Sequence, residues 1–215
     1  MNTIVYLIRH SEKFNLKEIA IYNTTNNRQQ KTEKMMLTIE GEKRAERLSK
    51  EPEFNDIDVL YSSDYARAMQ TAKYFIKENV RLNVDKRFNE RMYGTIDKEE
   101  KPNFFCEQYW DEKLKAEDGE SQEEVRARVT EAFNEVVENN KGKKIVIVSH
   151  GTAISFLLMN WCKLLDVQQN YLRKLEFNGN VIINRPYNSP EVFKVTIDEN
   201  DNIVNVENLE FESIM

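Results

Sequence analysis

The chain has 215 residues, of which 40% are hydrophobic and 32% are charged, and its formal net charge is -6. This balance is typical of a mildly acidic globular protein, and the negative charge disfavours general binding to nucleic acid or anionic membranes, since both would repel it. The longest apolar runs fall far short of the roughly 20 residues that a membrane span needs. With no recognisable secretion signal, we expect a single cytoplasmic domain over residues 1–215, with no membrane or nucleic-acid partner.

The two cysteines, Cys106 and Cys162, stand in unrelated sequence contexts. They form neither a CxxC motif nor a Cys/His spacing suited to a metal ion. We therefore expect both to be free thiols in a reducing compartment.

Short apolar runs rich in β-branched residues alternate with segments whose apolar residues recur at helical spacing. The runs lie at residues 3–8, 57–61, 80–84 and 144–148. This alternation predicts an α/β fold, a three-layer α/β/α sandwich with a mostly parallel central sheet, because helical crossovers cover both sheet faces. Near the end, "VFKVTI" and "IVNVENLEF" flank the Asp/Asn turn "DENDN" and predict a closing hairpin.

Two helices are predicted with their starting signals. In "SSDYARAMQTAKYFIKEN" the apolar residues from Tyr65 to Ile76 fall on one helical face, and Ser63 or Asp64 is placed to cap the first turn. In "SQEEVRARVTEAFNEVVENN" the apolar residues also repeat at helical spacing, and Ser121 with Glu124 forms a capping-box pattern.

Two irregular segments separate these elements. Residues 13–36 are polar and have no sustained period, while residues 91–119 are irregular but carry several aromatic side chains. Loops that hang from strand ends commonly build binding sites, so both segments are lid candidates.

The chain contains only two histidines, His10 and His150, and each one directly follows a predicted strand. Ligands of such sheets bind outside the carboxyl ends of the strands, so we expect the two rings at one rim. A single histidine in this position is more often structural, but two such histidines with basic neighbours favour a site.

Those neighbours suit an anion. The fork of Arg9 can bind two oxygens of a phosphate or carboxylate, although a surface ion pair is the commoner fate of an arginine. Arg67 lies in the first turn of a predicted helix, where free N–H groups and the helix dipole favour negative charge. Gly151, after His150, opens another predicted helix whose small residues let backbone N–H groups approach a ligand. A phosphoryl group is the natural occupant.

Metal-assisted chemistry has little support, because the sequence lacks an HExxH motif, a DxDxD-like cluster, an acidic trio at strand ends and a P-loop. A side chain must then accept the phosphoryl group. Neutral imidazole is a good nucleophile toward phosphorus, and His10 is the candidate. Departure of the substrate oxygen requires a proton donor, such as a carboxylic acid that the residue pattern alone does not identify.

Taken together, these residues resemble the histidine phosphatase superfamily, also called the phosphoglycerate mutase-like family. Five elements occur in the family's order: "LIRHSEK", "LTIEG", "SSDYARAMQTA", "FNERMYG" with "DGES", and "VSHGTAI". The resemblance implies the phosphoglycerate mutase-like fold, a phosphohistidine at His10, proton donation by Glu90, and a phosphate pocket of Arg9, Arg67 and His150. It implies no metal and no organic cofactor.

Further substrate-binding candidates are Ser11, Asn15, Tyr93, Gly151 and Thr152. Ser11 stands where the family usually has glycine, and a side chain this small is expected to preserve activity. Asn15 lies one place nearer to His10 than the corresponding asparagine of the mutase pattern, which leaves a phosphate ligand and a polar loop residue as equal alternatives.

The predicted function is a metal-independent phosphomonoesterase, monomeric or homodimeric, acting on a small phosphorylated metabolite or a phosphoprotein. The first alternative is a mutase-type phosphotransferase, which "FNERMYG" favours. The short gap of about 25 residues between Gly94 and Gly119 has no Arg-Arg pair to clamp a substrate carboxylate and disfavours it. This gap is also more acidic than basic, which disfavours highly anionic substrates. The second alternative is an inactive module that binds phosphate or phosphoproteins.

Overall fold

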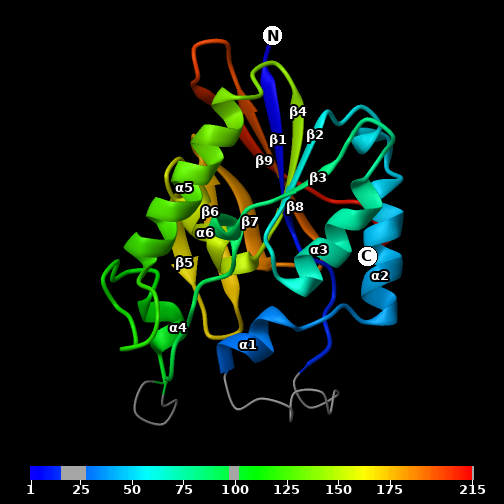
Figure 1. Cartoon of the computed structure of the whole chain (residues 1–215). Coiled ribbons are helices and arrows are strands. Elements are labelled where there is room, and N and C mark those ends of the chain that lie inside the picture. Colours follow the sequence, from blue (N-terminus) through cyan, green and yellow to red (C-terminus); the bar gives the residue numbers. More distant parts are fainter. Residues whose placement is uncertain (16–27, 97–101, 215) are drawn as a thin grey trace.

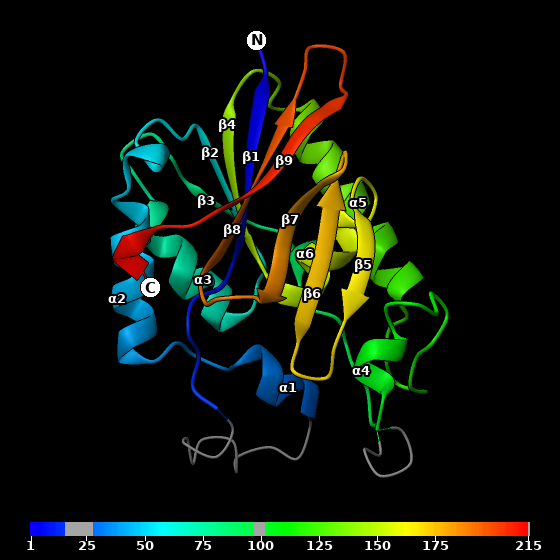
Figure 2. The same ribbon diagram turned by 180° about the vertical axis from the view of Figure 1, so that it is seen from behind.

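The computed structural model describes residues 1–15, 28–96 and 102–214. Its central sheet has six strands in the order β3-β2-β4-β1-β8-β9 (Figures 1 and 2). The strands are β1 (Thr3–Arg9), β2 (Val59–Ser62), β3 (Leu82–Val84), β4 (Lys144–Ser149), β8 (Glu191–Ile197) and β9 (Ile203–Leu209). The first four run parallel, and β8 and β9 form the antiparallel hairpin predicted for the end of the chain.

The register at the centre of the sheet sets the position of both histidines. Arg9, the last residue of β1, pairs with Ser149, the last residue of β4. His10 and His150 therefore leave neighbouring parallel strands at the same level of the same sheet edge.

Alternating side chains of the buried strands divide the core into two layers. Val5 and Leu7 pack on the side of α5 (Gln122–Glu138) and α6 (Gly151–Leu158). Tyr6 and Ile8 face the opposite way and pack on the side of α2 (Ile39–Ser49) and α3 (Ala66–Ala72). Because side chains alternate along a strand and both faces are covered, nearly every strand residue is apolar. The predicted three-layer α/β/α arrangement is confirmed.

The two predicted helices differ in how well they match the sequence pattern. α5 begins with the expected capping box, in which Ser121 and Glu124 exchange side-chain-to-backbone hydrogen bonds. α3 is shorter than predicted, ending at Ala72 before a 3₁₀ turn, η3 (Lys73–Phe75), and it begins after Tyr65 without a side-chain cap. Neither Ser63 nor Asp64 caps it. The Ser63 hydroxyl accepts from the N–H of Tyr65, just before the helix, and otherwise contacts Asn89 and His150.

A second sheet has three antiparallel strands, which the apolar periodicity did not reveal. It consists of β5 (Lys163–Val167), β6 (Leu172–Phe177) and β7 (Asn180–Pro186). Asn178 and Gly179 both adopt positive φ between β6 and β7, the conformation of a two-residue hairpin turn. The dipeptide "NG" was therefore the one local signal for this sheet.

Short elements complete the described chain: α1 (Arg28–Glu33), α4 (Phe104–Glu107), η2 (Pro52–Phe54), η4 (Lys86–Phe88) and η5 (Glu212–Ile214). Parts of both lid candidates, residues 16–27 and 97–101, lie outside the described residues. Cys106 and Cys162 are free thiols. Among the residues that the structure describes, no helix combines the length and apolar character of a membrane span.

Candidate active site

The structure brings the two histidines together. Their ring centroids lie 5.2 Å apart with the planes inclined at 61°, and both residues are almost fully buried. Arg67 reaches this pair from the first turn of α3 and donates from Nη2 to Nδ1 of His150 over 3.0 Å. Together with Arg9 at the end of β1, these residues form what we call the histidine–arginine cluster.

The hydrogen bonds of His10 select its tautomer. Nδ1 lies 2.7 Å from the backbone oxygen of Ser11, and only a protonated Nδ1 can bond to a carbonyl oxygen. The lone pair is therefore on Nε2. Burial, together with the positive charges of Arg67 and Arg9, holds the pKa of His10 well below its usual range, so the ring is neutral at pH 7.

The other histidine is fixed through both ring nitrogens. Since Nδ1 of His150 accepts from Arg67, its proton is on Nε2, which donates to the Ser63 hydroxyl over 2.8 Å. Ser63 in turn donates to the side-chain oxygen of Asn89 over 2.7 Å. Burial and the charge of Arg67 hold the pKa of His150 well below its usual range. This series of hydrogen bonds engages both nitrogens of the neutral His150 ring, so the ring is oriented in the site but is not free to attack phosphorus.

Two buried donors of the site lack partners among the described residues. Arg9 donates from Nη1 to the backbone oxygens of Tyr187 (2.7 Å) and Asn188 (3.0 Å), but its Nε is unpaired. The Ser11 hydroxyl oxygen is buried and also unpaired, whereas the Ser11 N–H donates to Thr71. Buried polar groups of native proteins are nearly always paired, so both are groups that a bound anion could satisfy.

The carboxylate of Glu90 lies at the first turn of α6. It accepts hydrogen bonds from the N–H groups of Ala153 (3.1 Å) and Thr152 (3.3 Å). Two of the N–H groups that were expected to approach a ligand at this helix start therefore contact a carboxylate of the protein itself at the positive end of the helix. The same contacts place Glu90 beside Gly151, which follows His150 directly.

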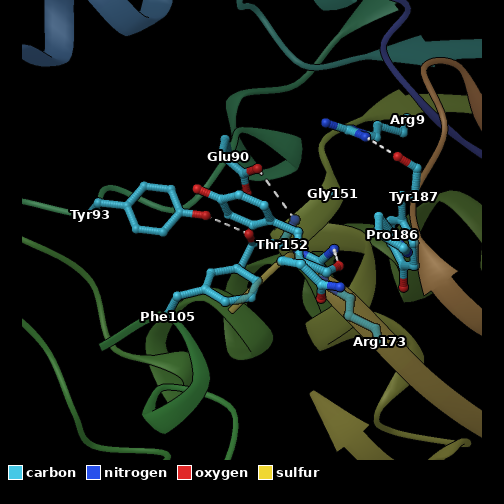
Figure 3. Close-up of a pocket in the computed structure, with 11 residues that line it drawn as sticks. Arg9, Glu90, Tyr93, Phe105, Gly151, Thr152, Arg173, Pro186 and Tyr187 are labelled. Carbon is cyan, nitrogen blue, oxygen red and sulfur yellow. Dashed lines mark hydrogen bonds between the residues drawn. The ribbon is translucent and has the colours of Figure 1, made fainter. Parts of the chain in front are cut away.

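A pocket of about 250 Å³ opens next to the cluster (Figure 3). It is lined by Arg9, Glu90, Tyr93, Phe105, Gly151, Thr152, Asn170, Tyr171, Arg173, Pro186 and Tyr187. Figure 3 shows Glu90 and Arg9 on either side of Gly151. Three of the four cluster members, His10, Arg67 and His150, are buried and do not line this pocket, so it reaches the cluster through Arg9 and Gly151.

The predicted substrate-binding residues divide into two groups. Tyr93, Gly151 and Thr152 line the pocket, and the Tyr93 hydroxyl lies 2.5 Å from the Thr152 hydroxyl. Ser11 is buried beside His10, and Asn15 is exposed; neither lines the pocket.

Five pocket residues form what we call the outer wall: Tyr93, Phe105, Tyr171, Arg173 and Tyr187. Arg173, on β6, and Tyr187, directly after β7, come from the second sheet and were not predicted as site residues. No motif marks them, since they approach the cluster only after the second sheet has packed near α6. Acidic residues of the described part of the 95–118 interval do not line the pocket.

Two buried supports explain family elements that carry no chemistry themselves. In "LTIEG" the N–H of Thr38 donates to the Glu12 backbone oxygen, and a Cβ at Gly41 would lie 2.0 Å from that oxygen, so only glycine fits. In "FNERMYG" the fully buried Arg91 donates to the backbone oxygens of Glu120 and Leu114. These contacts position the segments that follow His10 and Glu90.

Potential metal ligands are sparse. Over the described ranges, no three or more His, Cys, Asp or Glu side chains are grouped so as to hold a metal ion. The cluster instead offers imidazoles and guanidiniums, which are suited to an anion.

Comparison with known proteins gives the family. The sequence model of the histidine phosphatase superfamily (branch 1) matches residues 5–192. The chain belongs to this superfamily.

Individual relatives are distant. The chain is 27% identical over 163 residues to the protein named "Probable phosphoglycerate mutase GpmB" from Salmonella arizonae, a match that covers 72% of each chain. Among solved structures it is similar to Bacillus stearothermophilus YhfR, with a TM-score of 0.69, 19% identity, and coverage of 99% of this chain and 100% of that one. A mycobacterial glucosyl-3-phosphoglycerate phosphatase has a TM-score of 0.66 at 17% identity, with 97% of each chain covered. These structures share the fold.

Proposed function

We propose that the protein is a metal-independent phosphomonoesterase that forms a phosphohistidine at His10. The observation that carries this proposal is the state of the His10 ring. Its Nδ1 proton is held by the Ser11 carbonyl, which leaves the lone pair of Nε2 on a neutral ring beside two guanidinium groups. A nucleophile with a lowered pKa next to cations is the arrangement that covalent phosphoryl transfer needs.

The first step transfers the phosphoryl group to His10. Nε2 attacks phosphorus, and the bond between phosphorus and the substrate oxygen breaks. Arg9 and Arg67 stabilise the charge on the non-bridging oxygens, while Glu90 in its protonated form donates its proton to the leaving oxygen.

The second step restores the enzyme. The Glu90 carboxylate takes a proton from water as the water oxygen attacks phosphorus, and the bond from phosphorus to Nε2 breaks. Orthophosphate leaves, and His10 is neutral again.

The pocket supports a small metabolite as the substrate. Its volume of about 250 Å³ is below the range of about 300–1,000 Å³ that is typical of drug-sized ligands. A phosphorylated protein segment would have to reach a His10 ring that is almost fully buried.

A phosphoglycerate mutase activity is the second candidate, because the relative from Salmonella arizonae carries that name. Incubation with 3-phosphoglycerate and 2,3-bisphosphoglycerate distinguishes the two. A phosphatase releases orthophosphate, whereas a mutase accumulates 2-phosphoglycerate.

The central experiment measures turnover of p-nitrophenyl phosphate with a metal chelator present. We expect wild-type turnover and a loss of at least about 10³-fold in His10→Ala. Turnover that is absent in the wild type, or unchanged in His10→Ala, would refute the mechanism; absent turnover with retained phosphate binding would support a binding module.

The second histidine supplies the matched control. After acid-sensitive, base-stable phosphate is trapped on the protein, we expect label on wild type and on His150→Gln but none on His10→Ala. Label on His10→Ala would mean that the nucleophile has been assigned to the wrong residue.

A further inference from the structure

The segment that carries Glu90 has no regular secondary structure of its own. Residues 89–96 follow η4 and contain neither a helix nor a strand, although Asn89 and Glu90 are half-buried and Arg91 is buried. Backbone groups that are shielded from water and lie outside helices and sheets need other partners. Those partners therefore determine where the Glu90 carboxylate can lie.

Arg128, on α5, supplies three of these partners. Its Nη1 donates to the backbone oxygens of Arg87 (2.8 Å) and Asn89 (2.9 Å), and its Nη2 donates to that of Glu90 (3.3 Å). The other two N–H groups of the guanidinium bind the carboxylate of Glu120, from Nε over 2.7 Å and from Nη2 over 2.9 Å. All five N–H groups of this arginine are therefore engaged, an arrangement that the three donors of a lysine could not reproduce.

Glu120 holds the other side of the same segment. Its carboxylate accepts from the N–H of Met92 over 2.8 Å, and its own N–H donates to the Met92 backbone oxygen over 2.7 Å. The side chains of Arg128 and Glu120 are only 20% and 13% exposed, so solvent screens this ion pair less than a surface pair. We call Arg128 and Glu120 the acid clamp, since together they bind backbone groups on both sides of Glu90.

The acid clamp acts on the reaction only through the segment that it holds. Neither of its two residues lines the pocket, whereas Glu90 does. The Glu90 carboxylate also accepts from the N–H groups of Thr152 and Ala153 at the start of α6, and the bond to Thr152 is drawn in Figure 3. A displacement of the proton donor by about 1 Å can cost about 10²-fold in rate, so the backbone that carries it must be fixed.

We propose that Arg128 is a positioning residue for proton donation: with Glu120 it fixes the backbone at Glu90, so that the carboxyl group reaches the leaving oxygen of the substrate. This proposal rests on the phosphatase function and on the role of Glu90 proposed above. It adds to them a residue on α5 on which proton donation depends.

The test compares two substrates that depend differently on a proton donor. The leaving oxygen of glycerol 3-phosphate needs a proton, whereas p-nitrophenolate leaves without one. For Arg128→Gln we expect kcat to fall by about 10- to 100-fold on glycerol 3-phosphate and by less than about 3-fold on p-nitrophenyl phosphate. Equal slowing of both substrates would leave Arg128 a purely structural role and overturn the proposal.

Arg126→Gln is the matched control. Arg126 lies on the same helix, and its guanidinium contacts Glu112 and Asn160 instead of the segment that carries Glu90. The change removes the same charge from α5, so we expect wild-type kcat on both substrates. An unequal loss like that of Arg128→Gln would assign the effect to charge alone and overturn the proposal.

A second comparison uses Glu90→Gln as the background. In this background Arg128→Gln should slow the two substrates equally, because no proton donor remains to be misplaced. A further loss confined to glycerol 3-phosphate would contradict the proposal.

If Arg128→Gln fails to fold, as circular dichroism would reveal, Arg128→Lys takes its place. An ammonium keeps the charge but cannot bind the Glu120 carboxylate and three backbone oxygens together. A larger loss on glycerol 3-phosphate than on p-nitrophenyl phosphate supports the proposal, and equal losses overturn it.

Hydrogen exchange separates this proposal from the phosphatase function. Because the N–H groups of Thr152 and Ala153 donate to Glu90, its displacement in Arg128→Gln should speed their exchange by at least about tenfold, with β9 unchanged. Arg126→Gln should leave both N–H groups as in the wild type. If neither substrate is hydrolysed, or if Glu90→Gln slows both equally, the phosphatase mechanism is wrong and this measurement alone decides the positioning. Unchanged exchange at Thr152 and Ala153 in Arg128→Gln overturns it.

Discussion

The histidine–arginine cluster and the outer wall lie side by side, but the chain builds them differently. His10 and His150 come from the ends of adjacent parallel strands, and a polar network fixes both rings. In the outer wall, Arg173 and Phe105 come from elements far apart in sequence, with Cζ 5.4 Å from the ring centroid. The comparison separates a region fixed by strand ends and hydrogen bonds from one assembled by contacts between distant segments.

This division predicts which changes affect every substrate and which discriminate among them. A change in the cluster should lower turnover of any phosphomonoester. A change in the outer wall should alter the ratio between substrates.

The largest effect is expected from Glu90→Gln with a poor leaving group. Without a proton donor, an alkyl phosphate should lose about 10²–10⁴-fold in kcat, whereas p-nitrophenyl phosphate should lose much less, because its leaving oxygen needs no proton. Steady-state kinetics on both substrates measure this. Glu107→Gln, an exposed change on α4, is the control. Equal slowing of both substrates would show that Glu90 is not the acid.

Arg67→Gln should follow, with a loss of about 10²–10³-fold in kcat/KM. Removing the guanidinium takes one charge from the developing anion and also releases Nδ1 of His150. Because the effect is in the cluster, the fold-loss should be similar for different phosphomonoesters. Arg81→Gln, on the exposed surface, should behave as wild type. A loss restricted to one substrate class would break the division between the two regions.

A smaller effect is expected where the two regions meet. Tyr93→Phe removes the hydroxyl that lies 2.5 Å from the Thr152 hydroxyl and should lower kcat/KM by about 2- to 10-fold, the worth of one hydrogen bond. Thr152→Val should cost about as much, and the double variant little more than either single change. Additive losses would mean that the hydrogen bond has no functional role.

The smallest expected signal concerns protonation of the cluster. Both histidines of the chain lie there, and both have a pKa held well below the usual range. NMR of the folded, untagged protein should show no imidazole titrating near pH 6.5, whereas both should titrate there in urea. A folded-state resonance that titrates near pH 6.5 would contradict the assigned burial.

The same pKa shifts determine the sign of the pH dependence of stability. Below about pH 6.5 the imidazoles of the unfolded chain are protonated, whereas His10 and His150 of the folded protein stay neutral. The free energy of unfolding must therefore fall as the pH drops toward the lower pKa of the folded state. Each histidine contributes up to about 1.4 kcal/mol per pH unit in this window. Urea melts of wild type and His150→Gln measure the difference.

Much of the fold and of the cluster could be predicted from local patterns. The apolar strands, the Ser121 capping box and the terminal hairpin were read correctly, because each signal lies within a few neighbouring residues. The positions of His10 and His150 followed from the rule that parallel strands present their carboxyl ends at one edge.

Other features depended on competing contacts. Ser63 or Asp64 was expected to cap α3, but neither does; the Ser63 hydroxyl binds Asn89 and His150, since a buried imidazole requires a partner for Nε2. Backbone N–H groups at the start of α6 were expected to approach a ligand, and those of Thr152 and Ala153 donate to Glu90, which comes from a different segment.

The sequence by itself determined the parallel sheet, the family motifs and the histidines at the strand ends, because hydrophobic period and strand direction are local properties. Only the tertiary structure decided that Arg173 enters the pocket, since β6 reaches it after an antiparallel sheet has formed and packed. The burial of Arg173 among Phe105 and Tyr187 leaves no periodic pattern in the sequence, because these rings come from separate segments that meet only in the folded chain.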